Sequence, residues 1–267
     1  MHVRKPAVAG SFYPSDSSEL GEYLKKGCFQ GPVRPVKALI TPHAGYIYSG
    51  RTALKVFSQI EVPERNLLIG PNHRGMGSDF ALYPDGVWKT PLGEVSVDQD
   101  LAAKLLESSH DLHADPEAHG FEHSLEVILP FLQIKNPQAR IVPLIAGTLD
   151  WERARTAALA MGERLASFAD PVLVVVSNDM SHYENEASTR EKDRYALDAI
   201  LNLDPAGLVE AVTRHRITMC GFIPVYMLLI MAATLGITKA SLVEYTTSAE
   251  ASGDYDRVVG YAGFIFE

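Results

Sequence analysis

The sequence predicts a single three-layer α/β domain, with a largely parallel or mixed central sheet flanked by helices. Short, nearly all-apolar runs rich in β-branched residues or leucine alternate with helical patterns along the chain. The 267 residues contain no internal repeat, low-complexity tract or linker, which favours one domain over residues 1–267. Apolar residues make up 46% and charged residues 21%, as in soluble globular proteins, so a disordered or coiled-coil chain is excluded.

Four runs are expected to be strands covered on both faces, because almost every residue in them is apolar. They are Val36–Thr41, Asn66–Gly70, Arg140–Ala146 and Val172–Ser177. Two further strands, Ser241–Tyr245 and Arg257–Phe266, close the chain, and the alternation in the last favours an antiparallel or edge position. Residues 75–93 have many turn residues and no periodicity, so we expect a loop or a small hairpin over one end of the sheet.

Helices fit between these strands. The first is expected to begin at Asp16, with Glu19 as its capping-box partner, and to end at Gly27. Asp98 is expected to cap a helix over Gln99–Ser108. Three further helical patterns follow: Trp151–Phe168, Thr189–Leu201 and Asp204–Arg214.

The charge and the cysteines exclude several classes of protein. Lys plus Arg is 24 and Asp plus Glu is 33, a net charge of −9 without a long basic run, so nucleic acid and anionic membranes are poor candidate partners. Two cysteines, Cys28 and Cys220, are too few for a secreted disulfide scaffold, and the N-terminus lacks a signal-peptide core. We therefore expect a cytoplasmic protein with free thiols.

Histidines follow three of the predicted strands. His43 and His73 come after the first two, and His182 comes after Val172–Ser177, with Asp179 three residues before it. Because ligands bind beyond the carboxyl ends of strands in open α/β sheets, these side chains are expected to meet. One loop histidine is more often structural, but three at one end favour a metal or catalytic site. Imidazole binds Fe, Cu, Zn and Ni, so it does not identify the metal.

Cys220 lies in an uncharged segment, Ile217–Thr238, that is long enough to span a bilayer. Its Thr, Gly and Pro residues favour instead a turn followed by a buried helix. A thiol at a helix N-terminus has a lowered pKa and could serve as a metal ligand or a nucleophile. The alternative, a cysteine that acts as a small apolar residue, is equally consistent with the local sequence. Cys28 lacks such a context and is interpreted as structural.

The run Glu122-His123-Ser124-Leu125-Glu126 begins another helical stretch. It lacks the second histidine of the zinc-protease helix motif, so that motif is rejected. Glu122 or His123 could orient a metal ligand, but a solvated helix start with an acidic first turn is the favoured interpretation. Phosphate-binding, dinucleotide-binding and serine-hydrolase motifs are absent from the sequence.

Several motifs together resemble the Memo family, whose microbial members are called AmmeMemoRadiSam system protein B. They are Pro6–Pro14, Pro42–Tyr46, Gly70–His73, Glu122–Glu126, Ser177–His182 and Cys220-Gly221. Their order and spacing hold over almost the whole chain. The resemblance implies AMMECR-type and radical-SAM proteins as partners, beside an unknown small molecule or peptide.

The resemblance also implies a fold similar to that of LigB-type class III extradiol dioxygenases, which hold non-haem Fe(II) with two histidines and a carboxylate. By resemblance His43 and His73 are the two histidine ligands, and Cys220 stands in the carboxylate position. A thiolate is a softer ligand than a carboxylate, so the implied cofactor is Fe(II) or Cu and ring cleavage is in doubt.

The same resemblance assigns the remaining roles. His182 matches the acid/base histidine with Asp179 beside it, and Tyr48 is the aromatic residue of the substrate pocket. The first hypothesis is thus a metal-binding redox protein, a dioxygenase-like oxidoreductase. The second is a non-catalytic module that binds a peptide or partner with the same pocket, and the third is a hydrolase or transferase with Cys220 as nucleophile.

Overall fold

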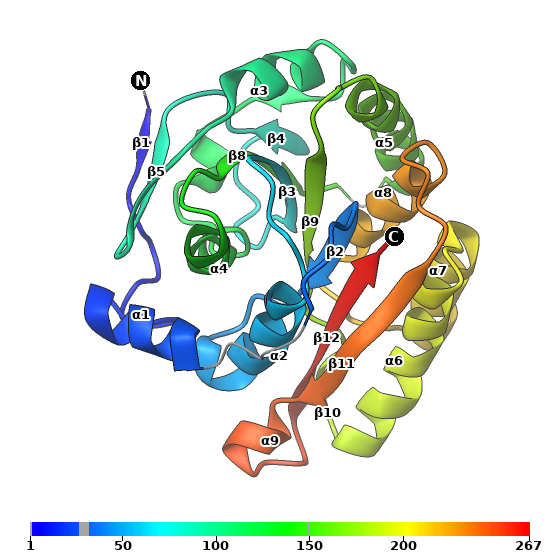
Figure 1. The fold of residues 1–267 in the computed structure, drawn as a ribbon. Coiled ribbons are helices and arrows are strands. Elements are labelled where there is room, and N and C mark those ends of the chain that lie inside the picture. Colours follow the sequence, from blue (N-terminus) through cyan, green and yellow to red (C-terminus); the bar gives the residue numbers. More distant parts are fainter. Residues whose placement is uncertain (1, 27–31, 149) are drawn as a thin grey trace.

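The computed structural model describes residues 2–26, 32–148 and 150–267. Its largest sheet has the strand order β10-β12-β2-β9-β3-β8-β4-β7, with β11 paired to β12 (Figure 1). Four parallel strands form its centre: β2 (Ala38–Thr41), β9 (Val172–Ser177), β3 (Arg65–Pro71) and β8 (Arg140–Ala146). All four match predicted apolar runs, and their carboxyl ends lie at one edge of the sheet.

Shorter or antiparallel strands extend the centre on both sides. They are β10 (His182–Glu184), β11 (Ala240–Thr247), β12 (Val258–Phe266), β4 (Phe80–Leu82) and β7 (His113–Ala114). β12 runs antiparallel to both β2 and β11, so the sheet is mixed and the predicted antiparallel last strand is confirmed.

A second, three-stranded sheet contains β1 (Val3–Arg4), β5 (Val87–Thr90) and β6 (Gly93–Ser96). β5 and β6 form an antiparallel hairpin, which begins inside the segment where a loop or small hairpin was expected.

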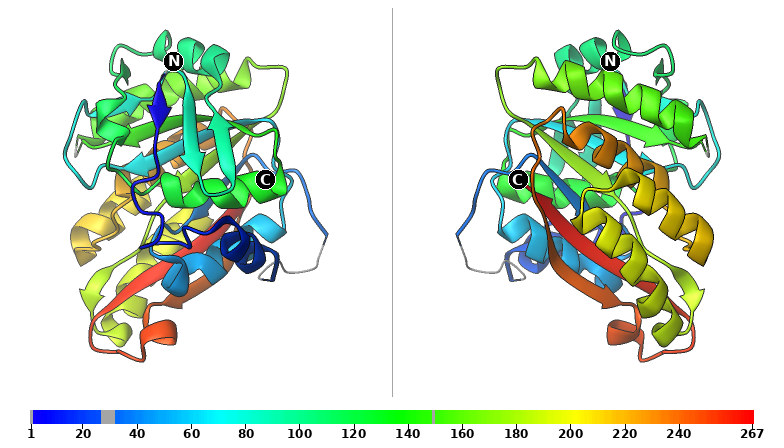
Figure 2. Two further views of the ribbon diagram at one scale, coloured as in Figure 1. Left: turned by 90° about the vertical axis from the view of Figure 1, so that its left-hand side faces the viewer. Right: turned by 90° about the vertical axis from the view of Figure 1, so that its right-hand side faces the viewer.

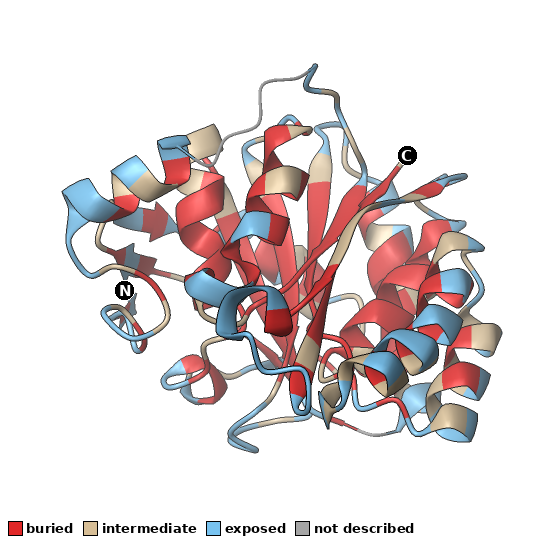
Figure 3. Cartoon of the chain, turned by 90° about the horizontal axis from the view of Figure 1, so that it is seen from below, coloured by how far each residue is buried: buried red, intermediate tan, exposed pale blue. Residues whose placement is uncertain are grey.

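Helices cover both faces of the large sheet, which confirms the predicted three layers (Figures 2 and 3). One face carries α1 (Ser17–Lys26), α2 (Tyr46–Ser58) and α4 (Leu129–Lys135). The other carries α5 (Trp151–Ala166), α6 (Glu186–Leu201), α7 (Pro205–His215) and α8 (Phe222–Ala232). The remaining short helices are α3 (Gln99–Leu106), α9 (Ala249–Ser252) and the 3₁₀ turns Glu117–His119 and Glu126–Ile128.

The helix starts follow side-chain capping. The carboxylates of Asp16 and Asp98 accept hydrogen bonds from backbone N–H groups of the first turns of α1 and α3, as the sequence predicts. α6 begins three residues before the predicted Thr189, because Asn185 caps it. The predicted end at Gly27, and Cys28, lie outside the described residues.

The uncharged segment around Cys220 forms a turn and then the buried helix α8, as expected. Among the described residues, no helix combines the length and apolarity that a membrane crossing requires.

Candidate metal centre

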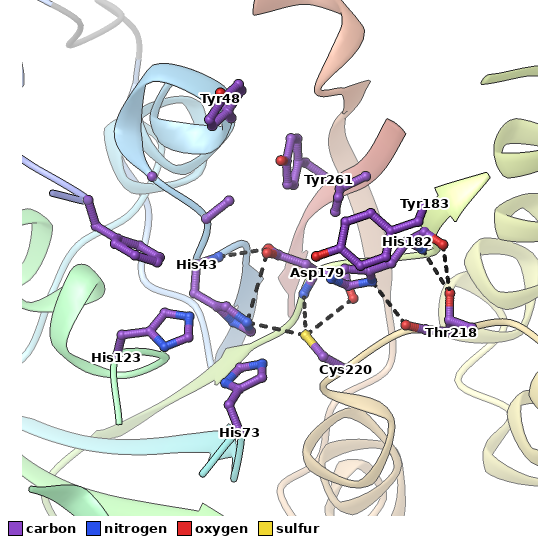
Figure 4. Close-up of a pocket in the computed structure, with 14 residues that line it drawn as sticks. His43, Tyr48, His73, His123, Asp179, His182, Tyr183, Thr218, Cys220 and Tyr261 are labelled. Carbon is purple, nitrogen blue, oxygen red and sulfur yellow. Dashed lines mark hydrogen bonds and ion pairs between the residues drawn. The ribbon is translucent and has the colours of Figure 1, made fainter. Parts of the chain in front are cut away.

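The carboxyl ends of the parallel strands open into a cavity of about 540 Å³ (Figure 4). His43, His73 and Asp179 follow β2, β3 and β9, so the sheet itself brings these three distant segments together. The cavity is lined by all six residues that were predicted for the site: His43, Tyr48, His73, Asp179, His182 and Cys220. Their proximity follows from the predicted topology, while their individual roles remain predictions.

Three histidines form a cluster that could hold a metal ion. His43, His73 and His123 each offer one ring nitrogen, and these atoms lie within 4.8 Å of one another. The ring of His123 packs against Phe12, at 4.7 Å between centroids. His123 was expected only as an orienting group or as part of a helix start, whereas the predicted third ligand, Cys220, is not part of this three-residue cluster.

Glu122 is buried, with 1% of its side chain exposed, so the favoured interpretation of a solvated helix start is wrong for this residue. Its carboxylate accepts hydrogen bonds from the backbone N–H of His73 at 2.6 Å, and from Nδ1 of His73 at 2.9 Å. The backbone N–H groups of His123 and Ser124 also donate to it. Burial alone would raise the pKa of Glu122, but the hydrogen bonds from His73 and Ser124 lower it to about 2.

The tautomer of His73 follows from this arrangement. An ionised carboxylate can only accept, so Nδ1 of His73 carries a proton, and in the neutral ring Nε2 is then the nitrogen with the lone pair. A neutral imidazole with a free Nε2 is the form that binds a metal.

His43 reaches the same state through a serine. The Ser177 hydroxyl donates to the carbonyl oxygen of Ser124 at 2.7 Å, which uses its only proton. At 2.6 Å from Nδ1 of His43, the Ser177 oxygen must therefore accept the Nδ1 proton, and Nε2 of His43 is left free. Burial and the neighbouring histidines keep the pKa of His43 well below its usual value, so this imidazole is neutral.

Cys220 places its sulfur 3.2 Å from Nε2 of His43. The residue after it must be glycine, because a Cβ on Gly221 would lie 2.4 Å from the carbonyl oxygen of Ser177. The sequence pattern predicted a lowered thiol pKa, and this expectation is wrong for the protein without metal. Burial, together with the nearby Asp179, raises the pKa of Cys220 well above its usual value, and this outweighs the helix terminus.

Asp179 lies behind His43 rather than in a hydrogen bond to His182. Its carboxylate accepts the backbone N–H of His43 at 2.8 Å and lies 3.8 Å from Nε2 of that residue. Its backbone N–H and carbonyl both contact Cys220. Burial raises the pKa of Asp179 to about 7, although the hydrogen bond from His43 opposes the shift.

His182 is held by Thr218. Its backbone N–H donates to the Thr218 hydroxyl at 2.8 Å, and its Nδ1 lies 3.0 Å from the Thr218 carbonyl oxygen. Because a carbonyl only accepts, Nδ1 of His182 carries the proton and Nε2 is available as a base. At the mouth of the cavity Tyr48 and Tyr183 are 44% and 68% exposed, so both residues are accessible to a ligand, and the Arg257 guanidinium lies over the ring of Tyr183.

Comparison with known proteins identifies the family. The model of the family described as Memo-like protein matches residues 4–265. The chain belongs to this family. A MEMO1 family protein of Aquifex aeolicus is 40% identical over 100% of both chains, and one of Methanopyrus kandleri is 37% identical over 98% of both.

One solved structure, an uncharacterized protein of Escherichia coli K12, is similar in fold to this Memo family chain. It has a TM-score of 0.54 at 15% identity and covers 86% of this chain and 99% of its own. At this identity the likeness concerns the fold alone.

Sequence reasoning missed parts of the Memo family pocket. An orienting role for Glu122 or His123 was the less favoured interpretation, and Ser177 was noted only as the end of a strand and the start of the motif Ser177–His182. A signal was present, since an acidic residue next to a histidine in a site region is a common partner of metal ligands. The residues meet only through tertiary packing, so their neighbours could not be known in advance.

Proposed function

We propose that this Memo family protein is a metal-binding redox protein that holds Fe(II) or Cu with His43, His73 and Cys220. The observation that carries the proposal is that His43 and His73 both use Nδ1 in a hydrogen bond to the protein. Both keep Nε2 free, and the Cys220 sulfur lies beside one of these atoms. Neutral imidazole and thiolate are ligands that iron and copper accept, so the donor set fits such an ion.

The third ligand is the open choice within this proposal. Cys220 is the softer candidate and would favour copper or thiolate-bound iron, whereas His123 completes an all-histidine set. The neutral Cys220 thiol would have to lose its proton on binding, so the affinity of a thiolate site rises with pH.

The bound metal would supply electron transfer or activation of an oxidant, and the chain's own residues would manage protons and the substrate. His182 accepts a proton at Nε2, since Nδ1 is held by the Thr218 carbonyl. Tyr48 contacts the substrate at the mouth of the cavity. Asp179 fixes the loop of His43 through its backbone N–H.

The direct test is metal content after anaerobic purification of wild type, His43→Ala and Cys220→Ser, with the exposed His110→Ala as control. We expect iron or copper in wild type and the control, and loss in His43→Ala. Addition of Co²⁺ to metal-free protein then identifies the third ligand, because a thiolate gives an intense sulfur-to-metal absorption band that Cys220→Ser abolishes. Wild type that binds no more metal than His43→Ala would refute the proposal.

A non-catalytic module that binds a peptide or partner is the second candidate, and the exposed tyrosines at the cavity mouth favour it. AMMECR-type and radical-SAM proteins are the partners to try. Binding that survives in His43→Ala and Cys220→Ser but is lost in Tyr48→Ala would support this function. Loss of binding on metal removal from wild type would favour the metal protein instead.

A further inference from the structure

The segment Glu122–Ser124 contacts His73 directly and His43 through Ser177, in both cases on the Nδ1 side of the ring. Glu122 contacts His73 directly, and the Ser124 carbonyl reaches His43 through the Ser177 hydroxyl. We propose that Glu122 and Ser177 are positioning residues that hold His73 and His43 in the tautomer with a free Nε2. This inference rests on the proposed function, because it matters only if these two histidines bind a metal.

Glu122 is fixed on both of its oxygens. One oxygen accepts Nδ1 of His73 and the backbone N–H groups of His123 and Ser124. The other accepts the backbone N–H of His73. The carboxylate therefore cannot turn away from the imidazole without breaking bonds to the main chain, and this sets both the tautomer and the ring orientation of His73.

Ser177 is needed because neutral His43 has two possible tautomers. If Nδ1 of His43 had no acceptor, the neutral ring could carry its proton on Nε2. That atom lies 3.8 Å from the Asp179 carboxylate and 3.2 Å from the Cys220 sulfur, which can act as acceptors for an N–H at Nε2. The tautomer with the proton on Nε2 would direct an N–H group toward the metal and would have no lone pair there. Ser177 disfavours this tautomer because its oxygen accepts a hydrogen bond from Nδ1–H of His43.

The chain offers a matched control for this step. Ser124 and Ser177 are both completely buried serines in the same region. The Ser124 hydroxyl donates to the Pro71 carbonyl, and only its main-chain oxygen takes part in the contact with Ser177. Ser124→Ala and Ser177→Ala therefore remove the same group and a similar hydrogen bond, but only Ser177→Ala frees the His43 tautomer.

The experiment measures two quantities on each variant. The first is Co²⁺ affinity by competition with a chelator, and we expect roughly 10–100-fold weaker binding in Ser177→Ala and in Glu122→Ala, which removes the acceptor for Nδ1 of His73. Ser124→Ala should bind like wild type. The second is the proton position on the histidine rings of metal-free protein, from two-bond ¹H–¹⁵N correlation spectra. His43 should carry its proton on Nδ1 in wild type and Ser124→Ala, and on Nε2 in a large fraction of Ser177→Ala.

The outcomes separate the two proposals. The positioning role is overturned if Ser177→Ala keeps the Nδ1 proton on His43 and binds Co²⁺ as tightly as Ser124→Ala. Failure of the metal function shows differently, as wild type that does not bind Co²⁺ better than His43→Ala, and the tautomer spectra still report on the positioning. If Glu122→Ala does not fold, the comparison of Ser177→Ala with Ser124→Ala alone decides.

Discussion

Glu122 and Glu126 lie four positions apart in the sequence, and both are almost completely buried. Glu126 accepts hydrogen bonds from the Arg4 guanidinium at 2.6 Å and from the Tyr13 hydroxyl at 2.7 Å. The backbone N–H groups of Ala7 and Val8 also donate to it, so this glutamate ties the N-terminal segment to the body of the protein.

Both glutamates are buried and hydrogen-bonded, and they differ in the groups that donate to them. The donors to Glu126 are the buried Arg4 guanidinium, the Tyr13 hydroxyl and two backbone N–H groups of the N-terminal segment. Glu122 faces an imidazole that lines the cavity. A buried carboxylate with all its hydrogen bonds made is therefore not by itself a sign of function. Whether its role is structural or positioning depends on whether one of its donors lines the cavity.

The largest expected effect is on stability at Glu126. Glu126→Gln leaves the Arg4 charge buried and uncompensated, and breaking such a pair reduces the free energy of unfolding by about 3–5 kcal/mol. Urea denaturation at neutral pH measures it. Glu163→Gln, which removes the same charge from an exposed position on α5, serves as control and should stay within about 0.5 kcal/mol of wild type. Equal stability of the two variants would contradict the structural role.

At Glu122 we expect a smaller loss of stability than at Glu126. Glu122→Gln can keep its carbonyl oxygen toward the three donors at one side and turns its amide toward a single N–H, with no buried guanidinium left unpaired. The free energy of unfolding should fall by roughly 1–3 kcal/mol in the same urea experiment. If it falls as far as in Glu126→Gln, the two glutamates have the same role and the comparison fails.

The sequence alone predicted those parts of the molecule that depend on local pattern. The apolar strands and the histidines that follow them are such patterns, which is why His43, His73 and His182 were found at one edge of the sheet. Helix α2 was not predicted, because Tyr46, Gly50 and several β-branched residues give it low helix propensity, and its stability comes from packing on the sheet.

The remaining features depend on contacts between distant segments. His73 and Glu122 are 49 positions apart, and His43 and Ser177 are 134 apart. The raised thiol pKa of Cys220 has the same origin, since the burial that raises it comes from tertiary structure. The sequence indicated six residues that line the cavity, but the contacts of two of them with Glu122 and Ser177 required coordinates.

Acid should destabilise the protein over a pH range in which Glu122 itself stays ionised. His119 is buried, and its carbonyl accepts a hydrogen bond from Arg4. Burial lowers the pKa of His119 to about 3, so the folded state resists a proton that the unfolded chain binds below about pH 6.5. Stability is therefore lost as the pH falls from about 6.5 toward 3, by roughly 2 kcal/mol at pH 5. Over this range Glu122 stays ionised, because its pKa is about 2.

Urea denaturation at pH 7 and pH 5, on wild type and His119→Gln, measures this effect. The glutamine can still donate to the Ala81 carbonyl that His119 contacts, but it has no group that titrates in this range. We expect the difference between the two pH values to shrink in the variant. An unchanged difference would show that other groups cause the acid sensitivity.

The smallest expected effect tests whether Glu126 depends on each of its donors. Tyr13→Phe removes the hydroxyl that donates to Glu126 and leaves Arg4 and the two backbone N–H groups in place. Hydrogen bonds to a charged group contribute more than neutral ones, so the free energy of unfolding should fall by roughly 1.5 kcal/mol. Tyr23→Phe is the matched control, because the Tyr23 hydroxyl donates to the neutral carbonyl of Tyr46 at 3.1 Å, and its loss should lower the free energy of unfolding by less.

Metal affinity should be unchanged in both variants, since neither hydroxyl contacts a histidine of the cavity. A Tyr13→Phe variant that lost metal affinity would show that Glu126 acts on the site through the N-terminal segment, and the division between the two glutamates would have to be abandoned.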